Sequence, residues 1–269
     1  MDRRPGGDPA FALREWEGGD GPTLLCVHGM LGSARSWDPN VVGLQRVARV
    51  AAVDLWGHGA SPAPADEARY AIGAMVDELD RARDRLGLER AMLCGHSFGA
   101  GLVLRYALSH PRRCAGVVFS NSMSALSPPE LFGTSRARAE RAAEIECGGL
   151  DAIRAMPMHP RHATRLPPGI REQVLADADR VDAAAVARLM RVTGPGLSVL
   201  DDLERIECPV LLINGRWERG FQPLREIALA RMPRCRVADV EAGHAVNLEN
   251  PAAFDAAVAA FVTEVVGAS

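Results

Sequence analysis

Cys94-Gly-His-Ser-Phe-Gly-Ala100 begins at the last residue of the apolar run 91–94 and leads directly into a segment with helical spacing. It contains the pattern Gly-x-Ser-x-Gly, which can hold a serine on a sharp turn between a strand and a helix. Glycine is required at both flanking positions because larger side chains would collide where strand and helix meet. The stretch predicts that Ser97 is a nucleophile held above a sheet. The alternative is a structural turn in which Ser97 only caps the helix.

Short apolar runs alternate with longer segments of helical spacing on both sides of this turn. The predicted strands are residues 23–27, 49–53, 91–94, 115–120, 210–213 and 236–240. The predicted helices are residues 36–45, 72–86, 98–109, 224–230 and 252–265. This alternation indicates an α/β fold with a mostly parallel sheet and helices on both faces, because parallel strands are joined by crossover helices that bury both faces.

One long segment interrupts the alternation. Residues 122–207 show no strand pattern, but they contain Arg- and Ala-rich helical stretches separated by proline and glycine. We predict a helical cap over residues 122–207, inserted into a core formed by residues 1–121 and 208–269. A disordered loop is the alternative, and the apolar content and helical spacing of the segment disfavour it.

A serine hydroxyl is a weak nucleophile unless a neighbouring base removes its proton. Among the seven histidines, His244 lies in Glu241-Ala-Gly-His-Ala-Val-Asn-Leu-Glu-Asn-Pro251, between the last predicted strand and the last predicted helix. A loop at this position returns over the carboxyl ends of the strands, so we predict that His244 is the base that activates Ser97. A purely structural histidine is the alternative.

Four segments spread over most of the chain carry a family likeness. They are His28-Gly-Met-Leu-Gly32 with Trp37, Asp54-Leu-Trp-Gly-His-Gly-Ala-Ser61, Gly95-His-Ser-Phe-Gly99, and Gly243-His244 with Asn250-Pro251. With these motifs the chain resembles the α/β-hydrolase superfamily, and within it the small, cap-bearing serine esterases and C–C hydrolases. The resemblance implies the α/β-hydrolase fold and a serine mechanism. It says little about the substrate, because one fold hosts many reactions.

The resemblance also implies an oxyanion hole. Its two donors would be the backbone N–H groups of Met30 and Phe98. Two fixed donors stabilise the negative charge that develops on a carbonyl oxygen during acyl transfer. A tight turn with no catalytic role is the alternative for the His28-Gly29 stretch.

The acid of the expected catalytic triad departs from the family pattern. The family commonly has Gly-x-x-Asp after the strand at 210–213, whereas this sequence has Gly215-Arg-Trp-Glu218. The chain order Ser97, Glu218, His244 still agrees with the order of nucleophile, acid and histidine in the family. We therefore expect Glu218 to be the acid. The alternative is that Glu218 only pairs with a neighbouring arginine.

Several side chains are candidates for contact with a substrate. They are His96, Leu31, Met156, Met158 and Phe221. We expect His96 to shape the pocket rather than to exchange protons, and the methionines and Phe221 to line an apolar acyl pocket. Ordinary packing of the cap is the alternative for the apolar residues. Cap arginines such as Arg161 and Arg165 offer contacts to a substrate carboxylate, although solvated surface is their ordinary role.

Composition narrows the class of partner. The net charge of -3 and the lack of a long basic run argue against a nucleic-acid partner and favour a small-molecule substrate. All 31 basic residues are arginine, which excludes mechanisms that need a lysine. Neither metal-ligand spacing nor a dinucleotide fingerprint occurs, so we expect no metal and no cofactor. The sequence makes no prediction about the oligomeric state.

The cysteines and the apolar runs bear on the location of the protein. The six cysteines form no C-x-x-C pair, and we expect them to be buried, reduced thiols. Residues 1–7 lead into no apolar segment of a signal peptide, and no run approaches the roughly 18 to 20 apolar residues of a membrane span. These features predict a cytoplasmic protein without a membrane partner.

Together the motifs predict an enzyme that cleaves a small-molecule carboxylic ester or lactone through an acyl-serine intermediate. Hydrolysis of a C–C bond in a vinylogous diketone is the first alternative. A specialised biosynthetic reaction, either thioester release or a rearrangement, is the second. From a different class, the chain is alternatively a ligand-binding protein that kept the fold and lost turnover.

Overall fold

Seven strands form one sheet in the order β1-β3-β2-β4-β5-β6-β7 within residues 8–267, which this computed structural model describes apart from the side chain of Phe132. The strands are β1 (Ala12–Glu15), β2 (Thr23–Val27), β3 (Arg49–Asp54), β4 (Ala91–His96), β5 (Cys114–Ser120), β6 (Val210–Gly215) and β7 (Cys235–Val240). All neighbouring pairs are parallel except β1 with β3. The predicted parallel sheet is confirmed, and each predicted strand has a counterpart.

Strand β1 was absent from the predicted set. It pairs antiparallel with β3 at the edge of the sheet, and its residues are partly or fully exposed. An antiparallel edge strand of four residues has one partner and no crossover helix, so its sequence carries little periodic signal.

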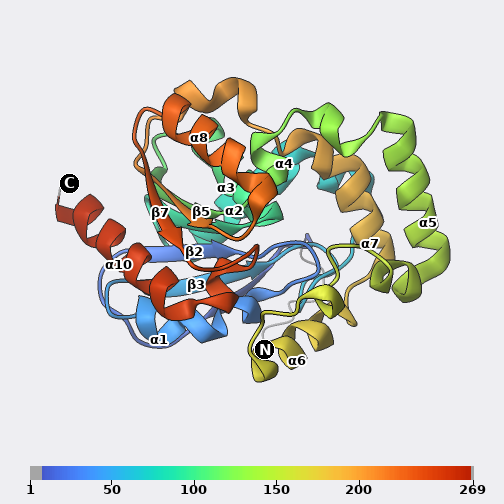
Figure 1. The fold of residues 1–269 in the computed structure, drawn as a ribbon, viewed down its shortest axis with the longest axis horizontal. Helices are drawn as coiled ribbons and strands as arrows, with labels where there is room; N and C mark the ends of the chain where they lie inside the picture. Colours follow the sequence, from blue (N-terminus) through green and yellow to red (C-terminus); the bar gives the residue numbers. More distant parts are fainter. Residues whose placement is uncertain (1–7, 268–269) are drawn as a thin grey trace.

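Helices cover both faces of the sheet (Figure 1). One face carries α2 (Ile72–Arg85), α3 (Phe98–Ser109) and α8 (Gln222–Arg231). The other carries α1 (Val41–Leu44) and α10 (Pro251–Gly267). This arrangement agrees with the predicted class and explains why the central strands are apolar throughout.

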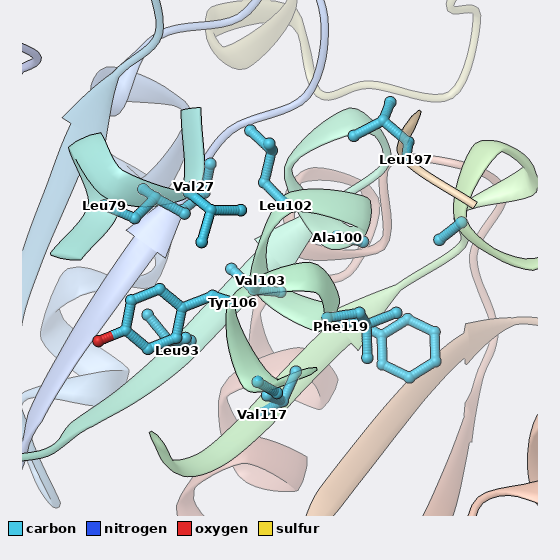
Figure 2. Close-up of a cluster of buried hydrophobic side chains, with 14 of the residues drawn as sticks. Val27, Leu79, Leu93, Ala100, Leu102, Val103, Tyr106, Val117, Phe119 and Leu197 are labelled. Carbon is cyan, nitrogen blue, oxygen red and sulfur yellow. The ribbon is translucent and has the colours of Figure 1, made fainter. Parts of the chain in front are cut away.

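Successive residues of the central strands point to opposite faces. In β4, Leu93 lies in the core beneath α3, whereas Met92 and Cys94 lie in the core beneath α10. Figure 2 shows Val103 and Tyr106 of α3 beside Leu93. The helix that follows the Gly-x-Ser-x-Gly turn is therefore packed directly on the strand that precedes it.

The helix predicted over residues 36–45 is present, but it is not one continuous α-helix. The segment forms the 3-10 helix η1 (Ala34–Asn40), followed by the single turn α1. Pro39 lies inside η1, and it has no backbone N–H to donate to an α-helical hydrogen bond.

Between β5 and β6 the described chain contains helices and no strand. The helices are α4 (Met123–Leu126), η3 (Pro129–Phe132), α5 (Ser135–Arg154), η4 (Pro160–His162), α6 (Pro168–Ala178), α7 (Ala183–Arg188), η5 (Leu189–Thr193), η6 (Gly194–Gly196) and η7 (Leu200–Arg205). Helices α5 and α7 lie beyond one end of the sheet, at the right of Figure 1, and α6 lies at the bottom of the view.

This helical segment packs in two ways. Ile145 and Ile153 of α5 form a cluster with Leu31 that is separate from the cores of the sheet. Leu197 and Leu203 belong instead to the core beneath α3 (Figure 2 shows Leu197 there). The C-terminal part of residues 122–207 therefore shares the core of the sheet, while α5 packs mainly with the segment itself.

All six cysteines are free thiols. Burial is confirmed for Cys26, Cys94 and Cys114, whereas Cys208 and Cys235 are only half-buried. The expectation of burial is wrong for Cys147, which lies on the solvent side of α5. Among residues 8–267, no helix combines the length and the apolar character needed to cross a membrane. Residues 1–7, on which the expected location partly rests, and residues 268–269 lie outside the described chain.

Candidate active site

Ser97 occupies a strained turn between β4 and α3. Its φ of 52° and ψ of -112° are unfavourable for a residue with a side chain. The neighbouring glycines explain how the turn is accommodated: a Cβ on Gly95 would lie 2.6 Å from the carbonyl oxygen of Gly99. A Cβ on Gly99 would lie 2.6 Å from the carbonyl oxygen of His28. The geometry has the form of a nucleophile turn, in which the Ser97 side chain makes no hydrogen bond to the helix that follows.

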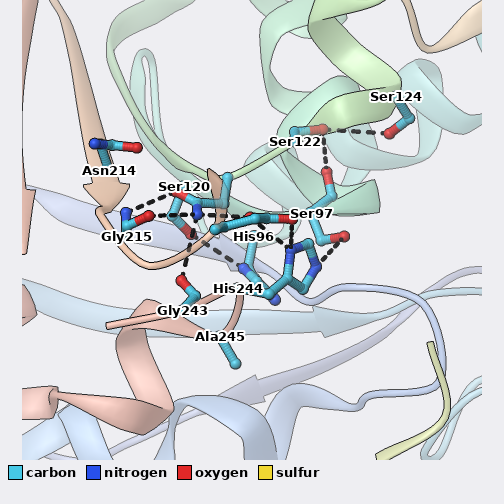
Figure 3. Close-up of polar contacts among 12 residues, drawn as sticks. His96, Ser97, Ser120, Ser122, Ser124, Asn214, Gly215, Gly243, His244 and Ala245 are labelled. Carbon is cyan, nitrogen blue, oxygen red and sulfur yellow. Dashed lines mark hydrogen bonds and ion pairs between the residues drawn. The ribbon is translucent and has the colours of Figure 1, made fainter. Parts of the chain in front are cut away.

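His244 lies between Ser97 and Glu218. Its Nε2 is 3.0 Å from Ser97 Oγ, and its Nδ1 is 3.0 and 3.1 Å from the two carboxylate oxygens of Glu218. Figure 3 shows the contact between His244 and Ser97. Because a carboxylate only accepts hydrogen bonds, the proton of the neutral imidazole resides on Nδ1, and Nε2 is left to accept from the serine. The structure thus brings together the three residues of the predicted triad.

The two alternatives for these residues do not agree with the contacts. As the first residue before α3, Ser97 makes no side-chain capping hydrogen bond. Glu218 contacts His244 rather than an arginine, and Arg216 pairs with Glu241 at 2.5 Å.

Asn121, directly after β5, holds Glu218 from the other side. Its Nδ2 donates a hydrogen bond of 2.6 Å to Glu218 Oε2, and its Oδ1 accepts one of 2.8 Å from the Gly215 N–H. The same Nδ2 lies 3.3 Å from the carbonyl oxygen of Gly243. Asn121 is fully buried, so it joins the loops after β5, β6 and β7 in one network. The sequence does not reveal this contact, because an amide at this position belongs to no motif.

Glu249 supports the loop that carries His244. One carboxylate oxygen accepts from the Gly243 N–H at 2.7 Å, and the other accepts from the Ala245 N–H at 3.2 Å. Glu249 ends the short helix α9 (Val246–Glu249), which brings its side chain back over the loop. The two backbone groups that flank His244 are therefore fixed by a single carboxylate.

The loop after β2 lies beside the nucleophile. A Cβ on Gly29 would lie 3.2 Å from Ser97 Cβ, so the loop and the turn are in direct contact. Met30 and Phe98, the expected oxyanion donors, both line the cavity above Ser97. Phe98 is the first residue of α3, and the first N–H groups of a helix have no partner within it.

Two buried histidines fix this loop. His58 accepts a hydrogen bond of 3.3 Å from the Leu31 N–H, and His28 accepts one of 3.0 Å from the Leu55 N–H. Burial lowers the pKa of His28 to about 4 and that of His58 to about 3. Both rings are neutral near pH 7, as acceptance through Nε2 requires. The hydrogen bond to His58 is made by Leu31, which has a positive φ of 65°.

His96 contributes a third neutral ring. Its Nδ1 lies 3.1 Å from Ser120 Oγ, and its ring meets that of His244 edge-on, with 5.0 Å between centroids. Burial lowers the pKa of His96 well below its usual range, and the nearby His244 acts in the same direction. The position agrees with a role in shaping the site.

A cavity of about 910 Å³ opens above Ser97. His96, Leu31 and Met158 line it, as expected for substrate contacts. Met156 and Phe221 do not. Met156 packs in the α5 cluster beside Leu31, and Phe221 is fully buried in the core beneath α3, so the expectation that they line the pocket is not met. Met156 lies just after the end of α5, and Phe221 ends a 3-10 helix over residues 219–221, so the packing of these elements sets the side-chain directions, which residue type and spacing do not reveal.

Among the described residues, no group of three or more histidine, cysteine or carboxylate side chains has the arrangement of a metal site.

Comparison with known proteins shows which of them this chain resembles. A family model described as "alpha/beta hydrolase fold" matches residues 22–144. A protein of Bacillus subtilis (strain 168), provisionally named 2-succinyl-6-hydroxy-2,4-cyclohexadiene-1-carboxylate synthase, is 29% identical, covering 90% of each chain. The provisionally named carbamate hydrolase RutD of Pseudomonas syringae pv. syringae (strain B728a) is 30% identical, covering 91% of this chain and 95% of its own. Carboxylesterase YbfK of Bacillus subtilis (strain 168) is 27% identical, covering 86% and 77%.

Solved structures share the fold over nearly the whole chain. MenH from S. aureus superposes with a TM-score of 0.83 at 19% identity, covering 96% of this chain and 99% of that one. The enol-lactonase from Burkholderia xenovorans LB400 superposes with a TM-score of 0.77 at 23% identity, covering 94% and 95%. At these identities the likeness concerns the fold alone.

Proposed function

Because the chain belongs to the α/β-hydrolase family and is a hydrolase enzyme, we propose that it cleaves a small-molecule carboxylic ester or lactone through an acyl intermediate on Ser97. The observation that carries the proposal is the position of His244, 3.0 Å from the hydroxyl of Ser97 and 3.0 Å from the carboxylate of Glu218. This geometry provides a base for the serine and an acid that orients the base.

The reaction proceeds in two halves. Ser97 Oγ attacks the carbonyl carbon while its proton passes to His244 Nε2. The N–H groups of Met30 and Phe98 stabilise the resulting oxyanion. When the tetrahedral intermediate collapses, His244 returns the proton to the leaving oxygen. Water then attacks the acyl-serine with His244 as base, and the second collapse releases the acid and restores the hydroxyl of Ser97.

We propose that the helical segment over residues 122–207 acts as a cap that selects the substrate. Met158, Leu166 and Met190 of this segment line the cavity together with Leu31. Their apolar surface favours an uncharged acyl portion, because burial of such a group removes it from water. The similarities to the carbamate hydrolase and the carboxylesterase support cleavage at a carbonyl as the shared chemistry.

A panel of aryl esters, aliphatic esters, lactones, thioesters and ring-fission diketones tests the proposal with wild-type protein and the Ser97→Ala variant. We expect turnover of esters or lactones by wild type, and intact-protein mass spectrometry should find the acyl group on Ser97. A fluorophosphonate probe should label wild type and leave Ser97→Ala unlabelled. Turnover without an acylated serine contradicts the proposal and favours a non-hydrolytic reaction. No labelling and no turnover favours a binding protein.

A further inference from the structure

A second hollow lies against the active-site cavity and shares Arg165 with it. It has a volume of about 370 Å³ and is lined by Arg165, Arg216, Trp217 and Arg219. Three of these residues belong to the loop after β6, in which Glu218 stands between Trp217 and Arg219. The hollow is therefore built on the same loop as the expected acid of the triad.

Arg165 connects the hollow to the catalytic histidine. Its guanidinium lies 5.4 Å from the centroid of the Trp217 ring. One of its terminal nitrogens, Nη1, would lie 3.2 Å from a Cβ built on Gly243, the residue before His244. An anion bound by Arg165 would consequently lie close to the histidine side of the reaction centre.

The charges of this hollow are unequally compensated. Glu241 pairs with Arg216 and accepts a hydrogen bond of 2.8 Å from Trp217 Nε1, which fixes the position of both side chains. Within residues 8–267, by contrast, no carboxylate pairs with Arg165 or Arg219. Two guanidinium groups thus remain able to bind an anion.

Besides Glu241, two further acidic side chains near the hollow are already engaged. Glu218 is held by His244 and Asn121, and Glu249 accepts from the backbone on both sides of His244. Hydrogen bonds to these carboxylates offset their charge and reduce their repulsion of an incoming anion. The two unpaired guanidinium groups and the Trp217 ring then determine which class of anion fits the hollow. The fork of a guanidinium matches a carboxylate, and the face of Trp217, which is 46% exposed, offers a stacking surface.

We propose that this hollow binds a carboxylate on the leaving-group portion of the substrate. The inference rests on the proposed acyl transfer at Ser97. His244 must deliver a proton to the leaving oxygen, so the leaving group lies on the imidazole side of the site. Arg165 packs against the loop of His244 on that side. The apolar lining contributed by Leu31 and Met190 is left for the acyl portion.

Matched esters test the proposal. 3-Acetoxybenzoate carries a carboxylate on its leaving group, and 3-acetoxybenzamide is its neutral counterpart. Phenyl hemisuccinate and phenyl succinamate form the corresponding pair for the acyl side. We expect the ratio of kcat/KM for 3-acetoxybenzoate over 3-acetoxybenzamide to fall by about 10- to 100-fold in the Arg165→Gln/Arg219→Gln double variant. The ratio for the succinyl pair should stay within about twofold, because its charge lies on the other side of the site.

Arg180→Gln is the matched control, since Arg180 is an exposed arginine of the same helical segment that lines neither hollow. If the ratio of kcat/KM for 3-acetoxybenzoate over 3-acetoxybenzamide is unchanged in the double variant, the proposal is overturned while the hydrolase function stands. An equal fall for the succinyl pair overturns the assignment to the leaving group.

A binding measurement separates this inference from the proposed function. In the Ser97→Ala protein, titration with 3-hydroxybenzoate should change the tryptophan fluorescence saturably, and Trp217→Phe should remove most of that change. If Ser97→Ala binds 3-hydroxybenzoate saturably but the wild-type protein hydrolyses no ester, the anion site stands and the proposed function is wrong. No saturable change would overturn the anion site whatever the esters show.

Discussion

Asn121 Nδ2 lies 2.6 Å from Glu218 Oε2, so a buried amide holds the carboxylate that orients His244. The two residues are 97 positions apart in the chain and meet at the carboxyl ends of neighbouring strands. A triad carboxylate fixes both the tautomer and the direction of its histidine. In the proposed mechanism the amide acts on the reaction through Glu218, without contact with the serine.

Replacement of Asn121 should reduce turnover more than substrate binding. We expect Asn121→Ala to lower kcat by about tenfold to 100-fold with a smaller change in KM, because Glu218 loses its anchor. Asn121→Asp should be most damaging at high pH, where two neighbouring carboxylates repel each other. Its kcat/KM relative to wild type should therefore rise as the pH falls. A flat ratio would show that the charge state of residue 121 is irrelevant. Asn214→Ser is a control, since Asn214 is equally buried at the same sheet edge but bonds to Gln222 and Asp239.

Loss of Ser97 or His244 should abolish most of the catalysis. We expect Ser97→Ala to lower kcat by about 10⁶-fold with the fold intact, and His244→Ala to be nearly as severe. The double variant should lose little more than either single variant, because the two groups act in one step. Steady-state kinetics and circular dichroism check the result. More than a tenth of wild-type activity in Ser97→Ala would rule out the serine as nucleophile.

The carboxylate of Glu218 should matter almost as much as the serine. Glu218→Gln should reduce kcat by about 10⁴-fold, because an amide can donate to His244 and favour the wrong tautomer. Glu218→Asp should also be impaired, since the shorter side chain does not reach the imidazole from the same loop. Glu226→Gln, at an exposed position of α8, is the control. Near-wild-type activity of Glu218→Gln would mean that another group orients the histidine.

Glu249 should affect His244 through the backbone. We expect Glu249→Ala to lower kcat by about tenfold to 100-fold, since the N–H groups of Gly243 and Ala245 lose their acceptor and the loop loosens. Combined with His244→Ala, the same change should cause no further loss. An additional loss in that double variant would indicate a role for Glu249 outside the histidine loop. Glu264→Gln, exposed on α10, serves as the control.

Stability should depend on pH through His28 and His58. Their pKa values are about 4 and about 3 in the folded protein, against 6.5 for an ordinary histidine. Between pH 6.5 and 4 the unfolded chain therefore binds more protons than the folded one, so the free energy of unfolding falls as the pH is lowered through this window. Urea unfolding at pH 7 and pH 5 measures the slope, and His58→Asn should make it shallower. An unchanged slope in that variant would exclude His58 as a contributor.

The sequence by itself determined the parts of this protein that follow from local pattern. The alternation of apolar runs and helical segments predicted the parallel sheet, and the glycines around Ser97 predicted a turn that only small residues permit. Chain order then led to His244 and Glu218, which the structure brings within hydrogen-bond distance of each other. These features are readable because backbone geometry restricts which residues can occupy each position.

Only the tertiary structure decided which distant side chains meet. Asn121 and Glu249 hold the triad through contacts that leave no periodic or motif signal in the chain. Met156 and Met158 are two residues apart, yet only Met158 reaches the cavity. Arg165 reaches the loop of His244 from a segment about eighty residues earlier in the sequence. Side-chain direction in loops depends on how separate elements pack, and that packing is a property of the whole fold.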